Sequence, residues 1–472
     1  MLQELIRERI KESIFGPILM GICATAGIIS LWLWLGGDLT VPLEERVPGM
    51  DKTGEILSTT GSRTGPAGVL IQAGGVPAEL TGAWPCFRGE HLDNISTETF
   101  APIPKGGRFP VFWSIDVGEG FAGAAIREGR VYLLDYDREK KADALRCLSL
   151  ADSEEIWRYT YPVNVKRNHG MSRTVPFVTD EVVVALGPKC HVTCLDARSG
   201  EKKWSLDLVH AYGAEIPPWY AGQNPLIDQN RVILAPGGSA LMAAFDCQTG
   251  ETIWETPNPH EWQMTHSSIT PMEFNGKRFY VYCASGGVVG VAAEDGRLLW
   301  ETDEWKIRIA NVPSPVILED GRIFLCGGYE AGSMMLNLEE KEGRIVPNIL
   351  YRMEAERFGS ATQTPLYYKG YFYGVRPDEQ LVCFDPEGNE KWASTGAYKF
   401  GLGAYMIAGS MIYVLNDMGL LSRVEATPEA FRLVDQTQVL EGSDSWGPIA
   451  LASGRMILRD LTKMVCLEVA AK

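Results

Sequence analysis

Aromatic and cationic side chains recur in the segments that separate short runs of alternating apolar residues. Trp219 and Tyr220 follow two prolines, and Trp262 and His266 lie in a polar stretch that begins at His260. Tryptophan, tyrosine and arginine contribute most to protein interfaces. We therefore expect these segments to form a protein-binding surface. The candidate residues are Arg167, His169, Trp219, Tyr220, Trp262, His266, Arg308, Arg357, Lys399 and Trp446.

Metal binding and nucleophilic catalysis lack the residue spacing that they require. His260 and His266 are six residues apart, and His169 and His210 fall in separate segments. There is no HExxH, P-loop, nucleophile elbow or GxGxxG motif that opens a helix. The ten cysteines include no CxxC pair, so we expect free, buried thiols. The sequence predicts no catalytic residue, no metal and no cofactor.

The charge balance excludes one class of partner. The 472 residues carry a formal net charge of −16, whereas binding to phosphate backbones requires clustered lysine and arginine. We therefore expect no nucleic-acid partner. The length exceeds what one small core needs, and internal repeats allow a single domain to grow this large.

One sequence motif recurs along most of the chain. It reads as a strand, a tight turn and a second strand that carries an aromatic residue. In its fullest form Asp246 starts the turn, Gly250 supplies a positive φ and Trp254 follows on the second strand. We expect the return-strand residues to be structural and to pack on a neighbouring unit. They are Trp113, Trp157, Trp204, Trp254, Trp300, Tyr351 and Trp392.

The spacing of these residues predicts the fold. From Trp157 to Trp392 they recur every 41 to 51 residues, the length of a four-stranded propeller blade. Eight units open alike, near Gly123, Arg173, Asn224, Ser267, Pro313, Thr362, Ala404 and Pro448. The last unit ends after a third strand, whereas Val111 to Asp116 forms an isolated return strand near the start. We predict that the early strand completes the last blade, which gives an all-β, eight-bladed propeller over residues 110–472.

The N-terminal region predicts a membrane anchor. Residues 13–37 contain no charged side chain, which is long enough to span a bilayer as one transmembrane helix. Arg7, Arg9 and Lys11 precede this run and acidic residues follow it, which places residues 1–12 in the cytoplasm and the propeller across the membrane. A cleaved signal peptide or a lipoprotein signal is the alternative. Residues 38–109 are expected to be a linker and lead-in segment.

The repeats resemble the quinoprotein-type, or PQQ-like, propeller repeat, whose hallmark is Ala-x-Asp-x-x-Thr-Gly-x-x-x-Trp. Residues 244–254 match it fully, and residues 194–204 match it with Cys194 for alanine and Ser199 for threonine. The other units are more divergent, and the unit around residues 423–434 is degenerate. Trp84-Pro-Cys-Phe-Arg-Gly89 also looks like the segment that precedes many bacterial propellers of this type.

The resemblance implies two classes of function, because fold does not fix function. PQQ-dependent dehydrogenases hold the quinone with calcium, a tryptophan floor and an aspartate base, and many have a disulfide of adjacent cysteines. This sequence has no Cys-Cys pair and few acidic residues in the loops before the inner strands. Scaffold propellers of the BamB type need only surfaces.

The sequence therefore favours a non-catalytic docking subunit, anchored in a bacterial inner membrane with its propeller in the periplasm. We expect other membrane or periplasmic proteins to be its partners. A PQQ-dependent dehydrogenase and a sensor that binds a small ligand or glycan at the ring centre are the alternatives.

Overall fold

The computed structural model describes residues 17, 20–32, 63–98, 102–103, 105–106, 109–167 and 169–470. The chain divides into two compact units, Met1–Met50 and Asp51–Lys472. In the first unit residues 20–32 are helical, and no helix in the described part of the chain is long and apolar enough to cross a membrane. The structure thus covers only part of the predicted transmembrane helix. The predicted cytoplasmic segment 1–12 and residues 38–62 of the predicted linker lie outside the described residues.

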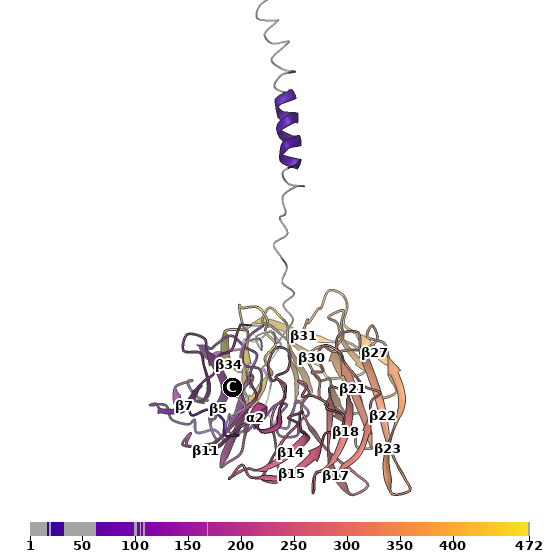
Figure 1. Cartoon of the computed structure of the whole chain (residues 1–472). Coiled ribbons are helices and arrows are strands. Elements are labelled where there is room, and N and C mark those ends of the chain that lie inside the picture. Colours follow the sequence, from indigo (N-terminus) through magenta and orange to yellow (C-terminus); the bar gives the residue numbers. More distant parts are fainter. Residues whose placement is uncertain are drawn as a thin grey trace, which may run out of the picture. The chain divides into compact units, whose positions relative to one another are not determined.

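The predicted propeller of eight four-stranded blades is confirmed. The second unit contains eight sheets, two of which carry a fifth strand (Figure 1). In blades one to seven, the four consecutive strands of each repeat pair with one another in chain order.

The strand bounds follow blade by blade. The first four blades comprise β4 (Ala125–Arg127), β5 (Arg130–Asp137), β6 (Ala142–Ser149) and β7 (Glu155–Pro162); β8 (Phe177–Val178), β9 (Val182–Leu186), β10 (His191–Asp196) and β11 (Lys202–Asp207); β12 (Leu226–Asp228), β13 (Arg231–Leu234), β14 (Ala240–Asp246) and β15 (Thr252–Pro257); β16 (Thr270–Phe274), β17 (Lys277–Ala284), β18 (Gly287–Ala292) and β19 (Leu298–Thr302). The last four comprise β20 (Val316–Ile317), β21 (Arg322–Gly327), β22 (Gly332–Lys341) and β23 (Arg344–Met353); β24 (Leu366–Tyr368), β25 (Tyr371–Val375), β26 (Leu381–Phe384) and β27 (Glu390–Ala393); β28 (Tyr405–Ala408), β29 (Met411–Leu415), β30 (Leu420–Glu425) and β31 (Leu433–Gln438); β32 (Ala450–Ala452), β33 (Arg455–Arg459), β34 (Lys463–Glu468) and β3 (Val111–Asp116). The short helix α2 (Leu208–Tyr212) follows β11.

The turn between the last two strands of a blade explains why the repeat motif contains aspartate and glycine. Asp246 Oδ1 accepts hydrogen bonds from the backbone N–H groups of Gln248 and Thr249 at 2.8 and 2.9 Å. Gly250 has φ +73°, and a Cβ there would lie 2.6 Å from the ring of Trp204 in the preceding blade. The tryptophan of the preceding blade therefore packs directly against this turn.

The same contact joins other pairs of blades. The indole Nε1 atoms of Trp113, Trp204, Trp254 and Trp392 donate to the carbonyl oxygens of Leu150, Cys247, Ala293 and Thr427 at 3.1, 2.9, 3.3 and 2.7 Å. The hydroxyl of Tyr351 donates to the carbonyl of Pro386 at 2.8 Å. Trp157 and Trp300 are buried, but their Nε1 atoms have no hydrogen-bond partner. The contact is therefore mainly apolar packing, which a hydrogen bond supplements at five of the seven sites.

A second chain of contacts joins blades near the ring centre. The backbone N–H of Val175 donates to Asn224 Oδ1 at 2.6 Å, and the N–H of Asn224 donates to Ser268 Oγ at 3.1 Å. The N–H of Ser268 in turn donates to Ser314 Oγ, and that of Ser314 to Thr364 Oγ1, at 3.3 and 2.9 Å. These side chains thus satisfy the backbone at the start of each preceding inner strand in blades two to five.

Ring closure joins the two ends of the repeat region. Strand β3 pairs antiparallel with β34 and supplies the outer strand of the last blade. In Figure 1 the labels β34, β5 and β7 lie close together, and β32 of the last blade contacts β4 of the purple first blade. Trp113, on β3, then docks on the first blade through Leu150. The early strand therefore removes the open edge that the last blade would otherwise expose.

The described residues ahead of β3 bind to the blades. Strand β1 (Val69–Gln72) pairs antiparallel with β7 and becomes a fifth strand of the first blade. Residues 84–96 then contact the inner strands of three blades: Trp84 bridges Ile126, Val178 N–H donates to the carbonyl of Pro85, and β2 (Ile95–Ser96) pairs with β28. We call residues 84–96 the plug, because they cover the ring centre at one face.

The first prediction compares two glycines of similar backbone conformation. Gly250 and Gly276 have φ +73° and +71°, but only Gly250 faces a ring, since nothing lies within 4 Å of a Cβ at Gly276. Gly276→Ala should lower the free energy of unfolding by about 1 kcal/mol. Gly250→Ala should cost about 1–3 kcal/mol more, because its methyl group must displace Trp204. Denaturant unfolding of both variants measures the difference, and equal losses would contradict the docking role assigned to the turn.

Candidate functional site

A pocket of about 300 Å³ opens at the ring centre on the face opposite the plug. The segments that enter the inner strands supply most of its wall, and Phe87 of the plug reaches it from the other side. The lining residues are Phe87, Phe121, His169, Arg173, Trp219, Gly222, Asn224, His266, Ala310, Val312, Tyr329, Ala361, Thr362, Gln363, Leu402, Trp446 and Pro448. Because nearly every blade contributes, the ring geometry itself creates the pocket.

Two nitrogen-bearing side chains form the polar part of this wall. Arg173 donates from Nε to the carbonyl of Trp219 and from Nη2 to the carbonyl of His169, and its guanidinium lies 5.2 Å from the ring centre of Phe121. Burial lowers the pKa of Arg173 to about 10, so it remains a cation at neutral pH. The pocket therefore contains a partly desolvated positive charge.

His266 is the second polar group. It is 8% exposed, and its Nε2 has no hydrogen-bond partner. Burial and then the nearby Arg173 charge lower its pKa to about 4, so the imidazole is neutral at physiological pH. The backbone carbonyls of Pro218 and Tyr220 accept from the protonated ring nitrogen. The unpartnered Nε2 of the neutral ring is therefore an acceptor that faces the pocket.

Aromatic rings surround these groups. Phe121 and Trp446 stack with their centroids 5.1 Å apart, and Trp446 Nε1 donates to Asp417 Oδ1 at 2.8 Å. On the other side the ring centroid of Trp219 lies 6.4 Å from that of His266. The pocket thus combines flat apolar walls with a cation and a neutral imidazole.

The backbone around the pocket is strained. His169, Trp219 and Tyr329 line it with φ values of +52°, +61° and +55°, and Tyr220 has φ +73°. Each such residue costs on the order of 1 kcal/mol and persists only where the surrounding structure demands it. Positive φ values also occur at turns throughout the blades, so these four residues mark tight turns of the pocket loops.

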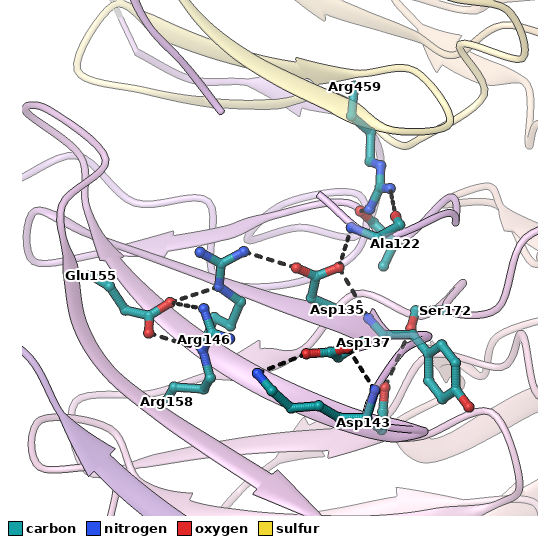
Figure 2. A network of polar contacts seen from close by, with 12 residues as sticks. Ala122, Asp135, Asp137, Asp143, Arg146, Glu155, Arg158, Ser172 and Arg459 are labelled. Carbon is teal, nitrogen blue, oxygen red and sulfur yellow. Dashed lines mark hydrogen bonds and ion pairs between the residues drawn. The ribbon is translucent and has the colours of Figure 1, made fainter. Parts of the chain in front are cut away.

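A buried carboxyl group supports the segment that carries Arg173. Asp143 accepts hydrogen bonds from the hydroxyls of Tyr161 and Ser172 at 2.6 and 3.3 Å, and Figure 2 shows Asp143 beside Ser172. The carbonyl of Ser172 accepts from the N–H groups of Phe121 and Ala122 at 2.7 and 3.1 Å. Burial raises the pKa of Asp143 to about 7. Ser172 therefore positions two residues: Arg173, its neighbour in the chain, and Phe121, whose ring lies under the Arg173 guanidinium.

An arginine of the last blade fixes the same region from the other side. Arg459 is buried and donates to the carbonyls of Ala122 and Gly118 at 3.0 Å each, a contact drawn in part in Figure 2. Asp135 in the first blade accepts from the N–H of Gly118 at 2.6 Å and pairs with Arg146 at 2.8 Å. The backbone at Gly118 and Ala122, on either side of Phe121, is therefore fixed by contacts with both the first and the last blade.

Four of the sequence candidates meet in the pocket: His169, Trp219, His266 and Trp446. Tyr220 is buried behind them and donates to the carbonyl of Lys166 at 2.8 Å. The remaining candidates lie outside the lining. They are Arg167, which pairs with Glu119 at 2.5 Å; Trp262, which stacks on His260; the exposed Arg308; Arg357, which donates to the carbonyl of Gly388; and Lys399, which pairs with Glu379 at 3.1 Å.

Sequence reasoning missed Arg173, Phe121, Tyr329 and Leu402. Arg173 marks the opening of the second blade, and a charged residue at the start of an inner strand was the available signal. The others have no signal of their own. They line the pocket because their loops turn toward the ring axis.

The donor set argues against a bound metal-quinone pair. The described lining residues include one arginine, two histidines, hydroxyls and amides, but no aspartate or glutamate. Nor do the described residues contain a group of three or more His, Cys, Asp or Glu side chains that could hold a metal. Calcium requires several oxygen ligands, usually including carboxylates. The pocket therefore fits an uncomplexed organic group better than a calcium-bound quinone.

The repeat motif, the docked aromatic residues and the closed ring define a PQQ-like propeller. A family profile described as outer membrane protein assembly factor BamB matches residues 110–205 and 141–394, together more than half of the chain. The chain belongs to this family.

Comparison with single proteins gives more distant matches. The chain is 25% identical over 178 residues to the quinoprotein alcohol dehydrogenase PedH of Pseudomonas putida, covering 34% of this chain. It is 24% identical over 174 residues to the outer membrane protein assembly factor BamB of Yersinia pestis, covering 36% of this chain. It spans only 28% and 41% of the lengths of these two relatives. BamB from Moraxella catarrhalis has a similar structure, with a TM-score of 0.52 and 13% identity, covering 76% of this chain and all of that one.

The second prediction concerns Asp143. Its pKa is about 7 in the folded chain against an ordinary value of 3.8, so the folded state holds the proton more tightly. This group's contribution to the unfolding free energy should therefore fall as pH rises from about 4 to about 7. Asp143→Asn keeps an acceptor oxygen for one of the two hydroxyls, can donate its amide N–H to the other, and has no ionising group. Between about pH 5 and about pH 8, the midpoint of thermal unfolding of the variant should rise relative to that of the wild type. Parallel curves would show that Asp143 does not titrate in this way.

Proposed function

We propose that this protein is a non-catalytic docking subunit, and that the face containing the central pocket binds its protein partner. The observation that carries the proposal is the gathering of aromatic and apolar side chains around the pocket mouth. Ile309, Tyr329, Leu402 and Met418 are between 37% and 59% exposed. Ile309 adjoins the lining residue Ala310, and Leu402 N–H donates to Asp417, the neighbour of Met418. Exposed apolar groups around a rigid pocket are typical of a protein-binding site.

Family membership supports the same conclusion. The matching family is described by an assembly factor, which acts through other proteins, and the curated BamB relative has the same description. The match to PedH keeps a PQQ-dependent alcohol dehydrogenase as the second candidate. The absence of carboxylates from the described pocket lining favours the docking function over that alternative.

We further propose that residues 13–37 anchor the chain in a bacterial inner membrane, with the propeller in the periplasm. The support is the uncharged run of these residues, with Arg7, Arg9 and Lys11 before it and Asp38, Glu44 and Glu45 after it. Membrane proteins keep lysine and arginine on the cytoplasmic side.

The third prediction tests docking with matched tryptophan variants. Full-length protein is purified in mild detergent with its associated proteins, which are identified by mass spectrometry. The double variant Trp219→Ala, Trp446→Ala should lose a stoichiometric partner, because central aromatic residues carry most of the binding energy. Trp262→Ala, outside the pocket lining, should retain it. Bound quinone seen by absorbance, together with calcium-dependent alcohol oxidation, would instead establish the dehydrogenase.

The fourth prediction tests the anchor. Full-length protein should stay with membranes during alkaline carbonate extraction, whereas a chain without residues 13–37 should be released. Extraction of both forms to the same extent would rule out membrane insertion through this segment.

A further inference from the structure

The central pocket has the chemistry of a site for a negatively charged group. Its wall presents the Arg173 guanidinium, and its described lining contains no carboxylate. A carboxylate is the natural acceptor for a planar guanidinium, and low dielectric strengthens this pairing. Resting on the proposed docking function, we propose that the pocket receives an acidic side chain, aspartate or glutamate, from the partner protein.

The unpaired histidine nitrogen is the more telling observation. A buried polar atom without a hydrogen bond costs about 1–3 kcal/mol. His266 Nε2 is such an atom, on a side chain that is 92% buried (8% exposed) and lines the pocket. Because this nitrogen is an acceptor, a backbone N–H of an entering segment would donate to it while the acidic side chain faces Arg173. One acidic residue would thus satisfy the histidine through its backbone N–H and place its carboxylate beside the cation.

The walls determine what accompanies the carboxylate. Trp219 lies on the His266 side of the pocket, and Phe121 stacked on Trp446 forms the other side. Residues next to the acidic one would pack on these rings and on Leu402. The recognised segment is therefore an acidic residue with apolar neighbours.

The rim favours a protein over a free small acid as the source of this group. A small acid could fill about 300 Å³. It would leave Ile309 and Met418, which lie outside the lining, in water, where they are 41% and 59% exposed. A polypeptide that inserts one side chain can cover the rim at the same time. Continuity between pocket and rim is the reason for choosing this occupant.

Site-directed photocrosslinking tests the proposal on the full-length protein in its own cells. Tyr329→p-benzoylphenylalanine places the photoreactive group on the rim, and Ile253→p-benzoylphenylalanine, on the outer strand β15, is the matched control. The crosslinked segment is identified by mass spectrometry. We expect an aspartate or glutamate close to the crosslinked residue in the Tyr329 sample alone.

Variants then test the two nitrogen groups. Arg173→Gln and His266→Gln should each reduce the crosslinked yield about tenfold or more, and Arg173→Lys should restore part of it, since a buried charge pair is worth several kcal/mol. Arg297→Gln, in the exposed turn before β19, should have no effect. Thermal unfolding checks that each variant is folded. If Arg173→Gln does not fold, a synthetic peptide of the crosslinked segment should bind at least about tenfold more tightly than its Asp→Asn or Glu→Gln analogue.

The outcomes separate this inference from the docking function. Crosslinking to a segment without an acidic residue, or crosslinking that Arg173→Gln leaves unchanged in a folded protein, overturns the inference and leaves docking intact. Absence of any crosslinked protein overturns both. A small acid that co-purifies with the protein and blocks crosslinking shows that the pocket holds a free ligand instead.

Discussion

Every blade depends on a contact that it cannot make by itself. A sheet of four short strands has two faces to bury, and each face is covered only by the next sheet in the ring. The tryptophan that rests on the neighbouring turn fixes how two sheets meet. Gly250 shows the constraint most clearly, because the turn must be bare of a side chain at the point where Trp204 lies. The motif recurs in the sequence because the contact between a tryptophan and the next blade's turn recurs around the ring.

The pocket follows from the same arrangement. When eight sheets radiate from one axis, the segments that enter their inner strands converge, and whatever side chains they carry are brought together. The plug closes the opposite face, so Phe87 forms a wall where an open passage would otherwise be. Asp143, Ser172 and Arg459 then hold the Phe121 and Arg173 segments in place (Figure 2). The specificity of the pocket therefore comes from a few loop residues mounted on a rigid, repetitive frame.

The sequence predicts the fold better than the site, and particular residues show why. Trp204 and Trp254 are part of a pattern repeated along the chain, so local spacing alone predicts the blades. Strand β1 is part of no repeat, and its pairing with β7 depends on a tertiary contact that no short pattern encodes. His266 lies in a polar segment and was expected at a surface, yet the loop turns inward and leaves it 8% exposed. Where an irregular loop turns depends on its packing partners rather than on its own composition.

The pairing of β3 with β34 has a consequence for how the protein is made. The last blade takes β3 from before the first repeat and β32 to β34 from the last one, so its outermost strand is synthesised before β4, the first strand of the repeats. That strand must wait, unpaired, until β34 has left the ribosome, more than 340 residues later (Asp116 to Lys463). The early blades can stack as they emerge, but the circle closes only once β34 has emerged. Until then β3 lacks its partner within the chain and is open to pairing with β34 of a second copy.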